Sequence, residues 1–176
     1  MKATKRLQKT LNSGVKMKLK RTVQGLFPVR IDNEFPGIRL ALWLFFPFTL
    51  LTLWRSQHHL FAVDGGAQSI ATIPLNTYPE GAADTVIGIF ALWGLSQLVI
   101  GLIYLVAAIR YRSLIPMLYM LAAVEYLIRM TYIPASKQIE TAGTAPGAAG
   151  NIWFFLFACL MLILSLWQNN TPVSGI

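Results

Sequence analysis

Charge is scarce in this sequence. Only 12% of its 176 residues are Asp, Glu, Lys or Arg, whereas a typical soluble domain carries about 25%. The hydrophobic residues make up 55% of the chain, give a mean hydropathy of +0.55 and gather in four long runs. This clustering indicates a protein of the lipid bilayer and disfavours a soluble helical bundle, which is the alternative for such apolar helices.

Cysteine and the motifs of common enzyme classes are also lacking. The single cysteine, Cys159, lies in an apolar run, which excludes a disulfide framework and a cysteine-based metal site. The sequence has no phosphate-binding glycine loop, no Gly-x-Ser-x-Gly elbow and no His-Glu-x-x-His motif. No histidine falls in the middle of an apolar run, so internal haem ligation is not expected. We therefore predict a protein that is not an enzyme and holds no cofactor or metal.

Helix-length apolar sequence is what the chain has in abundance. We predict an all-α fold: an integral membrane four-helix bundle with an N-terminal cationic amphipathic arm. The arm covers residues 1–36, the bundle residues 37–168 and a short cytoplasmic tail residues 169–176. The spans are predicted at about residues 38–54, 85–109, 113–133 and 152–167. The first span is short for a bilayer and has room to continue through residues 57–61, and Asn151 is the expected N-cap of the last.

The distribution of Lys and Arg predicts the orientation. Ten of the fifteen lie between Lys2 and Arg39, and the tight turn between the second and third spans adds Arg110 and Arg112. The connection after Arg55 has no further Lys or Arg before the second span. Because cytoplasmic flanks are rich in these residues, both termini are predicted to be cytoplasmic, in what we expect to be a bacterial inner membrane.

The N-terminal arm has an amphipathic pattern. If it is helical, its leucines and valines fall within roughly half of the circumference, and basic side chains occupy the flanks and the far side. Those basic residues are Lys9, Lys16, Lys18, Lys20 and Arg21. The pattern predicts a cationic helix on an anionic cytoplasmic leaflet. A topogenic tail without fixed structure and an arm docked on a partner protein are the alternatives.

Three polar residues within the predicted spans require an explanation. Gln97 lies in the second span, and Glu125 and Arg129 lie four residues apart on one face of the third. Counting outward from the turn brings Glu125 to the level of Gln97, so a hydrogen bond between them is expected. Charges at this depth face the bundle interior and find partners. The cluster is interpreted as a structural clamp, as a ligand pocket under the outer loop, or as part of a proton relay.

The loop between the first two spans carries a second group of polar residues. His58, His59 and Asp64 are candidate outer-loop contacts. Adjacent histidines cannot share one face of a helix or strand, and the group lacks the spacing of metal ligands. We therefore interpret them as ordinary polar residues at the membrane interface.

The unit formed by the second and third spans has a glycine-bearing helix, a basic turn at Arg110 and Arg112, and a following helix that ends near Arg129. Together with the outer loop, this unit resembles small four-helix bacterial membrane proteins of the DoxX-like kind. The resemblance covers about half of the chain and implies a fold more than an activity. The long basic arm departs from it and suggests an added binding role.

These features favour a partner-dependent role. We expect a non-enzymatic integral membrane accessory or structural subunit of a larger membrane complex, in contact with other membrane subunits and not with nucleic acid. The competing interpretation is a small transporter or ligand-binding membrane protein that uses Gln97, Glu125 and Arg129 beneath the outer loop.

Overall fold

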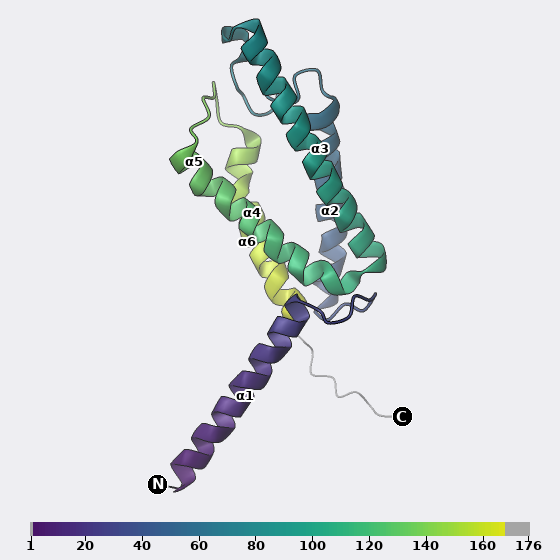
Figure 1. Cartoon of the computed structure of the whole chain (residues 1–176), viewed down its shortest axis with the longest axis vertical. Coiled ribbons are helices and arrows are strands. Elements are labelled where there is room, and N and C mark those ends of the chain that lie inside the picture. The colour runs from purple at the N-terminus through teal and green to yellow at the C-terminus, as the bar shows by residue number, and fades with distance from the viewer. Residues whose placement is uncertain (1, 168–176) are drawn as a thin grey trace.

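The computed structural model describes residues 2–167, with side chains from residue 13 onward, and its regular structure in this range is entirely helical (Figure 1). The predicted tail at residues 169–176 lies outside the described residues. The elements in chain order are α1 (Lys2–Leu26), α2 (Arg39–Phe61), η1 (Leu75–Thr77), α3 (Glu80–Arg110), η2 (Arg112–Leu114), α4 (Ile115–Met130), α5 (Tyr132–Ser136) and α6 (Pro146–Leu166).

Three helical segments in the described part of the chain are long and apolar enough to cross a membrane. They are Glu80–Arg110, Arg112–Ser136 and Pro146–Leu166. They suggest a membrane protein and agree with three of the four predicted spans. Helix α2 is also long, at 23 residues, but Arg39, Arg55 and Gln57 reduce its apolar character.

The helices extend beyond the predicted spans. Helix α2 continues to Phe61, and α3 begins already at Glu80. The predicted N-cap at Asn151 is wrong, because α6 begins at Pro146 and Asn151 lies inside it. Proline is favoured at the first helical position, where its fixed φ suits the helix and its missing N–H leaves no bond unmade. The Gly/Ala-rich residues after it therefore form the first turn of the helix.

The helices associate as two pairs, α2 with α3 and α4 with α6. Although a short turn joins α3 to α4, the two helices diverge from it and do not pack along their length (Figure 1). The small residues of α3 face α2 instead. A Cβ atom at Gly94 would lie 2.7 Å from the backbone nitrogen of Leu60, and one at Gly101 would lie 2.7 Å from Leu53 Cδ2. Small residues let helix backbones approach closely. The glycines of α3 therefore allow it to pack against α2.

An aromatic cluster joins the two pairs. Phe45 on α2 lies 5.4 Å from Tyr104 on α3 and 5.1 Å from Tyr119 on α4, between ring centroids. Phe157 on α6 lies 6.2 Å from the Tyr119 ring. The Tyr119 hydroxyl donates a hydrogen bond of 2.8 Å to the Ala41 carbonyl oxygen on α2. Tilted and edge-on rings at these separations add to the energy of burial, so this cluster is the junction of the fold.

Each end of the structure is tied by contacts between connecting segments. At one end the Ile38 N–H donates to the Leu164 carbonyl (3.0 Å), and the Ser113 hydroxyl donates to the Asp32 carbonyl (3.0 Å). The α1–α2 linker, the α3–α4 turn and the end of α6 therefore lie together. At the other end the Thr72 hydroxyl donates to the Gly143 carbonyl (2.8 Å), which joins the α2–α3 loop to the segment before α6.

The close approach of α2 and α3 predicts different effects for two glycines of the same helix. Gly94→Ala places a methyl group against the backbone of α2 and should destabilise the protein by about 1–3 kcal/mol. Gly88→Ala meets open space and should be neutral or stabilising by up to about 1 kcal/mol, because alanine favours a helix. Thermal unfolding in a neutral detergent measures both. Equal stability of the two variants would contradict the observed packing.

Candidate functional site

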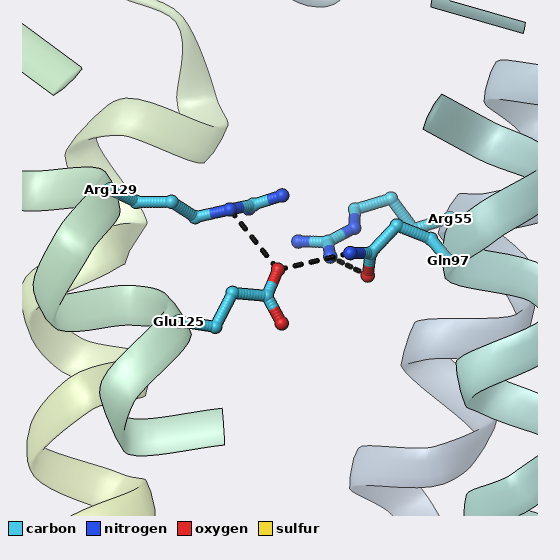
Figure 2. Close-up of polar contacts among 4 residues, drawn as sticks. All are labelled: Arg55, Gln97, Glu125 and Arg129. Carbon is cyan, nitrogen blue, oxygen red and sulfur yellow. Dashed lines mark hydrogen bonds and ion pairs between the residues drawn. The ribbon is translucent and has the colours of Figure 1, made fainter. Parts of the chain in front are cut away.

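The structure brings together the three polar residues expected to cluster (Figure 2). Gln97 Nε2 on α3 donates to Glu125 Oε1 on α4 at 3.0 Å. Arg129 Nε, one turn further along α4, lies 3.2 Å from the same carboxylate oxygen. The predicted hydrogen bond and the predicted intrahelical ion pair are both present. They form the polar contact between the two helix pairs near the middle of α3.

Arg55 is a fourth member that the sequence analysis missed. Its guanidinium Nη2 lies 3.4 Å from Gln97 Oε1, so the Gln97 amide links Arg55 to Glu125 (Figure 2). The first span was expected to end at Trp54, which placed Arg55 in a loop. The allowed continuation of that span through residues 57–61 was the signal, because a continuous α2 carries Arg55 alongside α3.

Trp93 lies one turn from Gln97 on α3 and provides an aromatic face beside the two arginines. The Arg129 guanidinium carbon is 4.9 Å from the Trp93 ring centroid, and that of Arg55 is 6.0 Å away. Arg129 also lies 5.7 Å from the Tyr126 ring. Aromatic faces attract cations, most strongly when water is excluded. The rings therefore help to hold two guanidinium groups near each other, although like charges repel.

The charges of the cluster do not balance. Arg55 and Arg129 face one carboxylate, that of Glu125, so the four residues carry one net positive charge. Arg55 Nε is buried and has no hydrogen-bond partner among the described residues. Side-chain exposure is 20% for Arg129 and 30% for Glu125. The guanidinium groups can therefore donate to a further hydrogen-bond acceptor. An anionic acceptor would also neutralise the positive charge of the cluster.

The outer-loop candidates have separate structural roles. His59 is buried, donates from Nδ1 to the Gly65 carbonyl at 2.8 Å and packs 4.6 Å from the Trp93 ring centroid. His58 instead lies beside Trp54. Asp64 accepts hydrogen bonds within its own loop. Within residues 2–167, no three His, Cys, Asp or Glu side chains lie close enough together to hold a metal ion.

Asp64 organises the turn that follows α2. Its carboxylate accepts from the backbone N–H groups of Gly66 (2.9 Å), Gln68 (3.2 Å) and Ser69 (2.7 Å). Partial burial alone raises the pKa of Asp64, but the N–H donors of Ser69 and Gly66 outweigh it and hold the pKa below its ordinary value. Gly65 and Gly66 have positive φ angles of 59° and 72°, a conformation that glycine adopts without strain.

The arm is helical, and its basic residues are on the surface. Lys16, Lys18, Lys20 and Arg21 are exposed on α1, and Lys9 lies earlier in α1 where side chains are not described. Valine and leucine side chains are exposed as well, with 63% of Val15 and 63% of Leu19 accessible. The helix extends away from the other helices, and its contacts with α4 and α6 lie near its C-terminal end (Figure 1).

Comparison with known proteins gave no match among protein-family models, curated proteins or solved structures.

The hydrogen bonds of Asp64 predict a pH-dependent loop. Because the folded-state pKa is lowered, the carboxylate stabilises the loop above its unfolded-state pKa, and this contribution is lost as the pH falls through the lower, folded-state value. The amide NMR signals of Gly66 and Ser69 should therefore shift only at a pH below the range in which an ordinary aspartate titrates. Asp64→Asn should abolish that titration, whereas Asp84→Asn, an exposed change on α3, should preserve it. A titration that persists without Asp64 would contradict this assignment.

Proposed function

We propose that this chain is a non-enzymatic accessory subunit of a larger membrane complex, held in the bilayer by its helices and docked on a partner through α1. The observation that carries the proposal is the position of α1. This 25-residue helix has no packing along most of its described length, and its apolar side chains remain exposed. Isolated helices are marginal in water, and most helical stability comes from packing an apolar face. A partner surface would provide that packing.

The chemistry of α1 favours an acidic partner protein. Three of its exposed apolar residues, Val15, Leu19 and Val23, recur every four positions and so form one stripe. Lysines flank the stripe. Because α1 points away from the helix pairs, only its base is near the lipid if those pairs cross the bilayer (Figure 1). An acidic amphipathic helix on a cytoplasmic partner fits this surface, while anionic headgroups meet Arg30 and Arg39 at the base.

We place α2 in the membrane as a fourth span. It runs along α3 for most of its length and turns its small hydroxyl side chains inward: Thr49, Thr52 and Ser56 are buried. The contacts that gather the α1–α2 linker, the basic α3–α4 turn and the end of α6 at one end support a common cytoplasmic side. A four-helix bundle in a bacterial inner membrane, of the DoxX-like kind, is the corresponding fold proposal.

Single cysteines test the fourth span. In a Cys159→Ser background, Lys16→Cys and Tyr111→Cys should be labelled from the cytoplasmic side by a membrane-impermeant maleimide in oriented vesicles. Asn76→Cys, in the α2–α3 loop, should be labelled only from the opposite side, because one span separates it from α1. Labelling of positions 16 and 76 from the same side would mean that α2 does not cross the bilayer.

The docking role of α1 predicts loss of a partner after a change in its apolar stripe. Leu19→Asp puts a carboxylate where the stripe meets an acidic partner, so the amount of partner co-purified with the full chain should fall about tenfold or more. Quantitative mass spectrometry of the native complex, purified in mild detergent, measures this.

Two comparisons define the result. Val63→Asp introduces the same charge at an exposed valine of the outer loop, where 98% of the side chain is accessible, and should leave the partner bound. Deletion of residues 2–25 should release the partner completely. A partner that stays bound without α1, or a wild-type chain that purifies alone from its native membrane, would contradict the proposal.

A further inference from the structure

The polar cluster has more charged groups than a hydrogen-bonded contact between two helices requires. Its members are Arg55, Gln97, Glu125 and Arg129. An intrahelical pair of Glu125 and Arg129, together with Gln97, is complete by itself. Arg55 adds a second guanidinium and no second carboxylate. Its contact with Gln97 is long, at 3.4 Å, and its Nε is buried without a partner among the described residues. The arginine is thus held in place but not neutralised.

The Trp93 ring fixes the location of the surplus charge. Both guanidinium groups lie at this ring, so their remaining N–H groups are close to each other and to the partly exposed Glu125 carboxylate. Arginine presents several N–H donors in a planar fork that matches a carboxylate or phosphate. Two such forks beside one ring are an anion-binding arrangement, and Glu125 occupies only part of its capacity.

The surroundings of the cluster are apolar. Leu121 and Ile128 lie one turn on either side of Glu125 on α4, and 50% and 45% of their side chains are exposed. Helices α3 and α4 diverge at this level, and the polar side chains reach across between them (Figures 1 and 2). In the bilayer these exposed leucine and isoleucine side chains contact acyl chains. An anionic group that is attached to a hydrocarbon chain can therefore approach the arginines from the lipid.

We infer that this cluster binds the anionic headgroup, a carboxylate or a phosphate, of a single-chain amphiphile. The headgroup oxygens accept from those guanidinium N–H groups of Arg55 and Arg129 that point toward Glu125 and do not already bond to Gln97 or Glu125. The apolar chain lies along Leu121 and Ile128 between the helix pairs. The site is independent of the docking role of α1, since α1 contributes none of its residues.

Direct binding to the purified full-length chain tests the inference. Radiolabelled palmitate and radiolabelled dodecyl phosphate are titrated against the protein in a neutral maltoside detergent. Saturable binding of at least one probe is expected. Arg55→Gln should raise the Kd about tenfold or more, because it removes one guanidinium from the headgroup. Lys137→Gln removes the same charge from an exposed position after α5 and should leave the Kd unchanged.

Glu125→Gln separates a binding site from a clamp. Loss of the competing carboxylate leaves both arginines available, so the Kd should fall about threefold to tenfold, while the Gln97 contact is kept by the new amide. A purely structural clamp predicts the opposite pattern: lower thermal stability of this variant and no ligand response. A higher Kd for Glu125→Gln than for the wild-type chain would overturn the inference.

Competition with truncated ligands identifies the source of the anion. Dodecanol lacks the charge, while acetate and inorganic phosphate lack the chain, and none of them should displace the labelled probe. If inorganic phosphate displaced the probe as strongly as dodecyl phosphate does, the site would bind free anions. That result would overturn the inference that its ligand is an amphiphile. Displacement by dodecanol, or no saturable binding of either probe, would overturn the anion site. Deletion of residues 2–25 should leave the Kd unchanged, so this result stands or fails separately from the docking of α1.

Discussion

The interior of a bilayer offers no hydrogen-bond partner, and this constraint explains most of the structure. Helix α2 shows how the chain meets it. The hydroxyls of Thr49 and Thr52 donate to the carbonyl oxygens four residues earlier, at 2.7 and 2.9 Å, and Ser56 does the same within the helix. Each hydroxyl is satisfied by its own helix and turned inward. A helix that is less apolar than its neighbours can therefore be accommodated beside α3.

The same constraint accounts for the division into two pairs. Lipid is as apolar as leucine, so helices associate where backbones approach closely or polar groups meet. Gly94 and Gly101 give α3 a close contact with α2. The two pairs are joined by the aromatic junction, where Phe45 of α2 contacts Tyr104 and Tyr119, and by the polar cluster further along. With the contacts between connecting segments at each end, these separate contacts hold the pairs together without packing along their whole length.

The sequence predicted the parts of the site that follow local rules. Glu125 and Arg129 share a face because four residues make about one helical turn, and Gln97 was found by counting outward along two helices from one turn. Arg55 required knowledge of where α2 ends, and the end of a helix is less certain than its presence. The sequence also did not show which helix packs against α3. Gly94 and Gly101 allow a close helix contact, but small residues do not identify the helix that makes it.

The presence of Arg55 is an energetic argument for the proposed binding site and against a purely structural clamp. A charge within the apolar region is costly, and an incompletely paired guanidinium gains back only part of that cost. In soluble proteins, well-packed apolar residues often replace buried ion pairs at no loss of stability. The clamp between Gln97 and Glu125 does not need this arginine, so stability alone gives no reason to hold it there. The proposed anionic ligand would give such a reason, because its negative charge would pair with the Arg55 guanidinium.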